Sequence, residues 1–245
     1  MTAKKRKKST VFLDILIVIL LIIIGVCAFN IGKILYRYYV GTKQYHEVAK
    51  VAKKETAEDK IDWKALKAKY PDIQAWLYQK DTVINYPVVQ GKDNSYYLYR
   101  MINGKYNVKG TLFIDYRVQR PFQDFLTVIY GHRMKDKSMF WTIADYRDKP
   151  EYYKQHPTMD LSTPTQNYTL QIFAACTIPA NSARYEFDFP EEKDKAFYLK
   201  WIRENSQLET DIQVTTSDKI VMLSTCTYEY DNARAVVFGK LVPKK

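Results

Sequence analysis

The sequence predicts a mostly β domain that is preceded by one membrane-spanning helix. Three observations support this prediction: an apolar segment lies near the N-terminus, six short runs rich in β-branched and aromatic residues follow Pro71, and turn-forming residues separate those runs. With 245 residues, 47% of them hydrophobic, the chain is long enough to bury a core. The residues alone do not distinguish an antiparallel barrel from a sandwich.

The apolar segment begins shortly after a basic cluster. Residues 15–32 contain no charged side chain, and these 18 residues fall within the length range of a membrane span. A cleaved signal peptide also begins with basic residues, but its apolar core is shorter and ends at a small-residue cleavage site, for which CAFNIGKIL is a poor match. We therefore expect an uncleaved anchor at residues 11–32, with residues 1–10 as a cytoplasmic tail and the rest of the chain outside the cell.

The net charge of +11 is concentrated near the N-terminus. Seven basic residues and one acidic residue lie before position 41, so this end carries +6 and residues 41–245 carry only +5. Basic and acidic side chains are interspersed in that remainder, which is typical of a mildly basic solvated surface. The charge therefore does not predict a nucleic-acid partner.

Two regions follow the anchor. Residues 33–60 are predicted to form a juxtamembrane stalk, and the charged, Ala- and Lys-rich sequence across residues 42–70 suits one or two helices. Residues 61–245 are predicted to form an extracellular catalytic domain, whose strand-like runs are TVINYPVV, GTLFID, FLTVIYG, YTLQIFAACTI, KIVMLSTC and ARAVVFGKL. Helical patterns interrupt these runs at residues 138–153 and 191–205.

The cysteines direct attention to the last two runs. The chain has three cysteines, of which Cys27 lies in the anchor and Cys176 lies in an apolar run, where a buried thiol is expected. If KIVMLSTC and ARAVVFGKL form a hairpin that turns around Tyr230, Cys226 and Arg234 become cross-strand neighbours, although a bulge would change that register. A nearby cation favours the thiolate form of cysteine, and a guanidinium can also donate hydrogen bonds to an oxyanion.

A catalytic thiol also needs a proton donor, and three histidines are available. His46 lies in the predicted stalk, and His156 lies in a polar segment before Pro157. His132 ends the run FLTVIYG beside a glycine and is the best placed of the three to face a groove. A single histidine is more often structural than catalytic, so the residues alone leave its role open.

Four segments together resemble the class B sortases, membrane-anchored cysteine transpeptidases of Gram-positive bacteria. These segments are INYPVVQGKDNSYYL, GTLFIDYR, YGHRMKDKSMF and LSTCTYEYDNARAVVFGKL, and the resemblance runs in order over residues 61–241. The histidine segment departs from the family pattern at Arg133 and Lys137, where the family commonly has Asn or His and a small residue such as Gly. These departures concern contacts at the rim of the site rather than its chemistry.

The resemblance implies an eight-stranded β-barrel with N-terminal helices and a helix in the loop between the sixth and seventh strands, which the pattern at residues 191–205 fits. It also implies Cys226 as the nucleophile, His132 as the general acid and base, and Arg234 as the residue that orients the substrate and stabilises the oxyanion. Substrate-binding positions that the same resemblance implies are Asn94, Leu98, Tyr185 and Ser224. For Leu98 and Tyr185, packing in the core is an equally good interpretation.

The reaction that this resemblance implies begins with cleavage of a C-terminal sorting signal, NPxTx-like or PxTG-like, after its threonine. The resulting thioacyl enzyme then transfers the surface protein to an amine of a peptidoglycan precursor at the membrane. No cofactor is implied, and the sequence contains no HExxH, paired CxxC or EF-hand pattern of a metal site. Alternatives are a pilin-joining sortase, a hydrolytic cysteine peptidase and a non-catalytic anchored binding module.

Overall fold

The computed structural model describes residues 8–52, 60–227 and 229–244. Two compact units divide the chain, Met1–Val40 and Gly41–Lys245. Most of the predicted cytoplasmic tail, at residues 1–7, lies outside the described residues, and so do residues 53–59 of the predicted stalk and Tyr228 of the hairpin turn.

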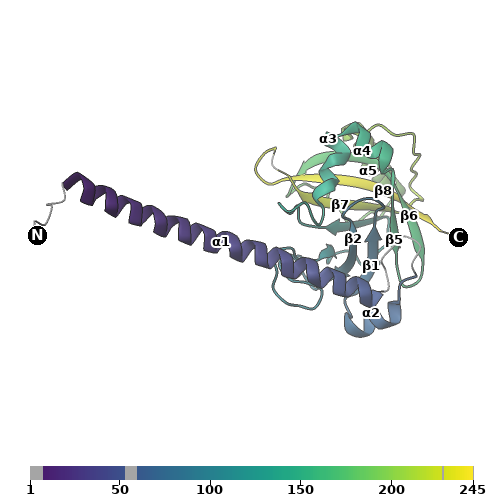
Figure 1. Cartoon of the computed structure of the whole chain (residues 1–245). Helices are drawn as coiled ribbons and strands as arrows, with labels where there is room; N and C mark the ends of the chain where they lie inside the picture. The colour runs from purple at the N-terminus through teal and green to yellow at the C-terminus, as the bar shows by residue number, and fades with distance from the viewer. Residues whose placement is uncertain (1–7, 53–59, 228, 245) are drawn as a thin grey trace, which may run out of the picture. The chain divides into compact units, whose positions relative to one another are not determined.

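The first unit is built from helix α1 (Lys8–Ala52), which continues into the second unit (Figure 1). The described side chains from Val11 to Ile34 are all exposed, including Cys27. The helix is long and apolar enough to cross a membrane, by length and composition only. Exposed apolar side chains along a helix of this length are the pattern that a lipid environment accommodates.

The second unit begins with the end of α1. Tyr45, Val48 and Ala52 are buried there, so this part of the helix packs into the domain. A second helix, α2 (Trp63–Lys69), follows, and its N-cap residue Asp62 accepts a hydrogen bond of 3.0 Å from the Ala65 amide. The prediction of one or two helices across residues 42–70 is therefore confirmed.

Eight strands form a closed barrel in the order β1-β2-β3-β4-β7-β8-β6-β5. The strands are β1 (Ile73–Tyr78), β2 (Asn85–Gln90), β3 (Leu112–Ile114), β4 (Leu126–Tyr130), β5 (Thr158–Ser162), β6 (Asn167–Pro179), β7 (Ile220–Cys226) and β8 (Ala233–Pro243). The eight-stranded barrel confirms the fold that the resemblance implied. The antiparallel arrangement expected from the strand runs is wrong at two places, because β2 pairs with β3 and β4 pairs with β7 in parallel.

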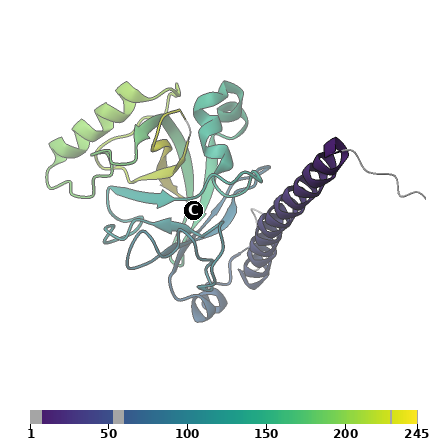
Figure 2. The ribbon, with the colours of Figure 1, turned by 90° about the vertical axis from the view of Figure 1, so that its left-hand side faces the viewer.

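The helices between the strands differ in detail from the sequence patterns. The pattern at residues 138–153 corresponds to a 3₁₀ turn (Trp141–Ala144) and two short helices, α3 (Asp145–Asp148) and α4 (Pro150–Gln155), since a proline begins a new helix more readily than it continues one. Helix α5 (Glu192–Asn205) lies between β6 and β7, as expected, and outside the barrel (Figure 2).

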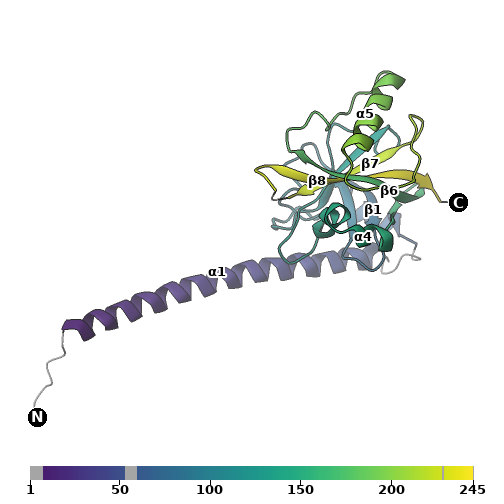
Figure 3. The same ribbon diagram turned by 90° about the horizontal axis from the view of Figure 1, so that it is seen from above.

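Three neighbouring strands position the site. Strands β4 and β7 are parallel, so their carboxyl ends lie at the same edge of the sheet, and β8 begins at that edge because it runs antiparallel to β7. Figure 3 shows β7, β8 and β6 as adjacent strands. Residues at the end of β4, the end of β7 and the start of β8 therefore meet at one end of the barrel.

Candidate active site

The β7–β8 hairpin brings the candidate thiol and guanidinium together. Cys226 is the last residue of β7, and its cross-strand partner is Arg234, near the start of β8. Ser224 pairs with Val236 in the same register, so the predicted hairpin and its centre near Tyr230 are confirmed. Alternate residues of a strand point to the same side of the sheet, which places Ser224, Cys226 and Arg234 on one face.

The pairing of β4 with β7 brings His132 to the same place. Tyr130 is the last residue of β4 and pairs with Ser224, and the Gly131 amide donates a 3.1 Å hydrogen bond to the Ser224 carbonyl. The Thr225 hydroxyl donates to the Gly131 carbonyl at 2.8 Å and ties the two chain segments together. His132 lies two residues beyond Tyr130, as Cys226 lies two beyond Ser224, so the parallel register carries the histidine toward the cysteine.

A pocket of about 200 Å³ lies at this meeting point. Its lining includes all seven residues singled out from the sequence: Asn94, Leu98, His132, Tyr185, Ser224, Cys226 and Arg234. The remaining lining residues are Phe113, Tyr130, Gly131, Ala180 and Thr225. Of the other two histidines, His46 lines a different pocket and His156 ends helix α4. Among the three histidines, the pocket therefore contains the one that the strand-end argument favoured.

A carbonyl contact orients His132. Its Nε2 atom lies 2.6 Å from the Leu98 carbonyl oxygen, and because a carbonyl can only accept, Nε2 carries the proton and Nδ1 is left to exchange one. Burial lowers the pKa of His132 below its usual value of 6.5, and the Leu98 contact opposes that shift only in part. The imidazole is therefore neutral at pH 7 in the absence of a bound substrate.

The two cysteines of the second unit have different surroundings. Cys176 is 3% exposed in β6, and burial raises the pKa of its thiol to about 12. Cys226 is partly exposed and lines the pocket with Arg234. Nucleophilic attack requires a thiolate that a substrate can reach, so Cys226 is the suitable thiol of the two.

Arg234 keeps its charge available to the pocket. Its Nη1 atom donates to the Ala233 carbonyl at 3.0 Å, and among the described residues no carboxylate lies within ion-pair distance of the guanidinium. A guanidinium has five N–H donors and stays protonated at any physiological pH. Several donors therefore remain for a substrate carbonyl.

A buried carboxylate that sequence reasoning missed holds one side of the pocket. Asp115 is fully buried and accepts hydrogen bonds of 2.9 Å from Asn94 Nδ2 and from the Tyr130 hydroxyl. Burial raises the pKa of Asp115, but hydrogen bonds from Arg117, Tyr130 and Asn94 outweigh it, so the pKa lies below 3.8. The segment GTLFIDYR contains this residue, but a strand end followed by Asp carries no specific signal for such a role.

Tyr185 and Ser224 meet across the pocket. Their hydroxyl oxygens are 2.9 Å apart, and the Tyr185 ring lies 5.7 Å from the Tyr130 ring. Burial raises the pKa of Tyr185 to about 12, so the phenol stays protonated and can donate this hydrogen bond. Tyr185 is partly buried against the core as well as being part of the pocket lining, so the two interpretations of this residue are compatible.

The two departures from the family pattern lie outside the pocket lining. The Arg133 guanidinium lies over the Trp141 ring, 4.8 Å from its centroid, and its Nη1 atom is 3.5 Å from the Thr227 hydroxyl. Lys137 is exposed in the loop after His132 and adopts a left-handed backbone conformation with φ of 62°. Arg133 thus connects the loop after His132 to the loop after Cys226.

Comparison with known proteins identifies the class. The family model described as "Sortase domain" matches residues 80–242. Sortase B of Listeria monocytogenes is 39% identical over 71% of this chain and 71% of its own. The crystal structure of sortase B from B. anthracis in complex with AAEK1 superposes with a TM-score of 0.77 and 36% identity, covering 86% of this chain and 100% of that chain.

A third relative carries a substrate. The Staphylococcus aureus sortase B–substrate complex superposes with a TM-score of 0.74 and 28% identity, covering 83% of this chain and 95% of that chain. The family match and the sortase B relatives show that the chain is a cysteine transpeptidase. The chain belongs to the sortase family, with class B sortases as its relatives. Sortases act on surface proteins and cell-wall precursors, and the apolar helix α1 fits a membrane anchor for such an enzyme.

Proposed function

We propose that this sortase cleaves a C-terminal sorting signal after its threonine and transfers the surface protein to an amine of a peptidoglycan precursor. The observation that supports this proposal most is the convergence of Cys226, His132 and Arg234 on one pocket through the register of β4, β7 and β8. Acyl transfer requires a nucleophile, a proton carrier and an oxyanion donor, and these three side chains are suited to those roles.

The reaction exchanges one amide bond for another. His132 takes the proton of the Cys226 thiol at Nδ1, the thiolate attacks the threonine carbonyl carbon, and the tetrahedral oxyanion is stabilised by hydrogen bonds from Arg234. The bond to the next residue breaks, and His132 gives a proton to the departing amine. The acceptor amine then attacks the thioester, loses its proton to His132 and expels the thiolate, so no oxidant or reductant is needed.

The remaining pocket residues are suited to holding the signal peptide. We assign this role to Asn94, Leu98, Tyr185 and Ser224, which line the same pocket as the thiol. A substrate complex of the Staphylococcus aureus sortase B supports the proposal that a protein of this fold binds a substrate. Polar side chains would fix the peptide backbone, while Leu98 would contact an apolar side chain.

We further propose the topology that the basic N-terminal cluster predicts. Residues 1–10 would lie in the cytoplasm, residues 11–32 would cross the membrane, residues 33–60 would form the stalk, and residues 61–245 would form the extracellular catalytic domain. Accessibility of a cysteine introduced at position 2 to an impermeant thiol reagent, compared between intact and permeabilised cells, tests this orientation in a background in which Cys27, Cys176 and Cys226 are all replaced by Ala. Labelling in intact cells would reverse it.

The nucleophile is tested by intact-mass measurement on the full-length protein in detergent. The protein is mixed with a panel of NPxTx-like and PxTG-like peptides, with and without hydroxylamine as a simple amine. We expect an adduct on Cys226 whose mass is that of the peptide up to threonine, and a hydroxamate product when the amine is present. Cys226→Ala should abolish both, because no other pocket residue supplies a thiol.

The matched control is Cys176→Ala, which removes a buried thiol outside the pocket lining and should keep the activity. An inactive but folded Cys176 variant beside an active Cys226 variant would overturn the assignment. Formation of only the carboxylic acid at every amine concentration would indicate a hydrolytic peptidase instead.

A further inference from the structure

The loop after His132 is a small closed unit. Arg133 and Met139 pair as an isolated antiparallel bridge, and the Phe140 amide donates to the His132 carbonyl at 2.9 Å. Lys137 and Met139 both have positive φ angles, 62° and 59°, which residues other than glycine rarely adopt. Contacts elsewhere in the molecule must therefore hold the tip of this loop in its conformation.

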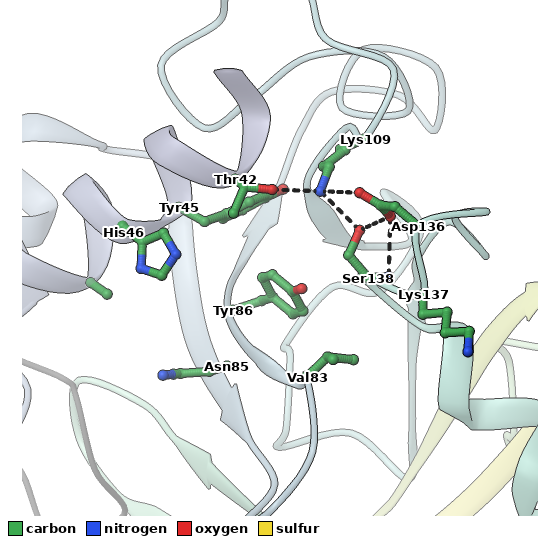
Figure 4. Close-up of a pocket in the computed structure, with 11 residues that line it drawn as sticks. Thr42, Tyr45, His46, Val83, Asn85, Tyr86, Lys109, Asp136, Lys137 and Ser138 are labelled. Carbon is green, nitrogen blue, oxygen red and sulfur yellow. Dashed lines mark hydrogen bonds and ion pairs between the residues drawn. The ribbon is translucent and has the colours of Figure 1, made fainter. Parts of the chain in front are cut away.

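Lys109 provides those contacts. Its side chain is 2% exposed, and its Nζ atom lies 2.7 Å from Asp136 Oδ2 and 3.0 Å from Ser138 Oγ at the tip of the loop. A third oxygen, Thr42 Oγ1 of helix α1, lies 2.8 Å from Nζ (Figure 4). A buried ammonium is costly unless oxygens surround it, so these three partners fix its position.

The backbone next to Lys109 contacts the partner of His132. Gly110 has φ of 59°, and a Cβ atom there would collide with the carbonyl oxygens of Tyr97 and Leu98. The Thr111 amide donates to the Tyr97 carbonyl at 3.0 Å. Leu98 is the residue whose carbonyl accepts the His132 Nε2 proton. Residues 109–111 thus contact two segments that hold the imidazole. One is the loop that follows His132 in the chain, and the other is the backbone around Leu98, whose carbonyl accepts the hydrogen bond from the ring.

The end of helix α1 completes this support. The Tyr45 hydroxyl donates to the Gly110 carbonyl, and Thr42 accepts from Lys109. At Gly41 a Cβ atom would lie 2.9 Å from Asn107 Oδ1 and 3.0 Å from Lys109 Cδ, so the helix approaches this segment as closely as glycine allows. All of these residues belong to the second compact unit, Gly41–Lys245.

We propose that Lys109, held by Thr42 of helix α1, is a positioning residue for His132. Its ammonium fixes the loop that follows the histidine, and its adjoining backbone fixes the carbonyl that orients the imidazole. Residues 41–45 of α1 therefore contribute to turnover as part of the catalytic unit rather than as a passive stalk. This inference rests on the proposed role of His132 as the proton carrier.

The test compares, in the full-length protein, two lysines that line a second pocket, between helix α1 and the loop after His132. Lys109→Met removes the ammonium while keeping an unbranched side chain, and Lys137→Met makes the same change at an exposed position of the loop. We expect Lys109→Met to lower kcat by about tenfold or more with little change in KM, because small displacements of a catalytic group cost rate rather than binding. Lys137→Met should match the wild type.

A second readout separates positioning from stability. The rate at which iodoacetamide alkylates Cys226 is measured against pH, at a temperature well below the unfolding transition of each variant. An imidazole that is held less firmly is better solvated, which raises its pKa. In Lys109→Met, the part of the rate–pH curve that depends on His132 should therefore move to higher pH, toward the usual value of 6.5. A variant that only unfolds at lower temperature, with kcat and this profile unchanged, would overturn the proposal.

Two further variants keep the result decisive. If Lys109→Met does not fold, Thr42→Val removes a single acceptor of the lysine at an exposed helix position, and a fall in kcat of about threefold with the same direction of pH shift is expected. An unchanged Thr42→Val would then refute the proposal. His132→Gln is measured in parallel: if it retains turnover, the proposed function fails, whereas an inactive His132→Gln beside a normal Lys109→Met refutes only the role of the lysine.

Discussion

Two walls of the pocket are built in different ways. The hairpin wall, defined here as Ser224, Cys226 and Arg234, lies on adjacent strands whose main-chain pairing sets its spacing. The loop wall, defined as Asn94, Leu98, His132 and Tyr185, lies on segments outside the named strands. These segments are held by side-chain contacts such as Asn94 to Asp115 and Lys109 to Asp136.

The difference predicts how substitutions act on each wall. A side chain on the hairpin wall can be replaced without moving its neighbours, because the strand register does not depend on it. A loss of activity there reports chemistry. The geometry of the loop wall depends on buried charges outside the pocket lining, so substitutions at those charges should change both stability and activity.

The largest effect in this comparison is expected at Arg234 on the hairpin wall. We expect Arg234→Lys to reduce single-turnover acylation by about a hundredfold, because an oxyanion donor acts through a directed hydrogen bond that an ammonium on a different stem does not reproduce. Arg234→Ala should lose at least as much. Both variants should unfold at nearly the same temperature as the wild type, since the main-chain pairing of Cys226 with Arg234 remains.

The reactivity of the thiol separates the two functions proposed for Arg234, a charge that favours the thiolate and a directed hydrogen bond to the oxyanion. Alkylation of Cys226 is measured against pH for the wild type, Arg234→Lys and Arg234→Ala. Restoration of both acylation and thiol reactivity by lysine would mean that Arg234 acts only through its charge, and the directed hydrogen bond would have to be abandoned.

Sequence reasoning predicted the strand register of the hairpin wall but not the contacts that support the loop wall, for a physical reason. The alternation in KIVMLSTC and ARAVVFGKL contains the register that pairs Cys226 with Arg234, because both strands belong to one local hairpin. The bonds from Asn94 to Asp115 and from His132 to Leu98 join residues 21 and 34 positions apart, and no local pattern indicates them. The family resemblance supplied the residue names on this wall but not their supports.

Two strands, β1 and β5, were not among the six runs that the sequence predicted as strands. Strand β1 (IQAWLY) is buried at four of its six positions without alternation, and β5 (TMDLS) is short and largely polar. Strand β1 lacks the period-two pattern that identifies a half-buried strand, whereas β5 has it, with Met159 and Leu161 buried, but over only five residues. The parallel pairs β2–β3 and β4–β7 are equally invisible in the sequence, because strand direction depends on long-range packing.

The next largest effect is expected at Asp115, which supports the loop wall. Asp115→Asn removes a fully buried charge that accepts bonds from Arg117, Tyr130 and Asn94, and we expect the free energy of unfolding at pH 7 to fall by about 2 kcal/mol. KM for the signal peptide should rise, because Asn94 loses its carboxylate partner. Chemical denaturation and steady-state kinetics measure the two effects.

The difference in stability between the wild type and Asp115→Asn should depend on pH in a defined direction. The pKa of Asp115 is lower in the folded protein than its ordinary value of 3.8, so its stabilisation is present above pH 3.8 and is lost as the pH falls through the lower folded value. The wild type and Asp115→Asn should therefore converge in stability below pH 3.8. Asp124→Asn, which breaks a more exposed pair with Arg120, is the control and should change little at any pH. Equal effects at both positions would contradict a special role for the buried carboxylate.

The smallest effect is expected where the two walls meet, at the hydrogen bond between Tyr185 and Ser224. We expect Tyr185→Phe and Ser224→Ala each to raise KM by less than about tenfold and the double variant to be no worse than either, since a bond between two neutral groups contributes about 1 kcal/mol and can be lost only once. Tyr198→Phe is the control: it loses a partly buried hydrogen bond of 2.7 Å to the Arg184 carbonyl outside the pocket lining, so it should lower stability and leave KM unchanged. If the effects of Tyr185→Phe and Ser224→Ala instead add fully, each hydroxyl binds the peptide independently, and the walls are joined by the substrate rather than by each other.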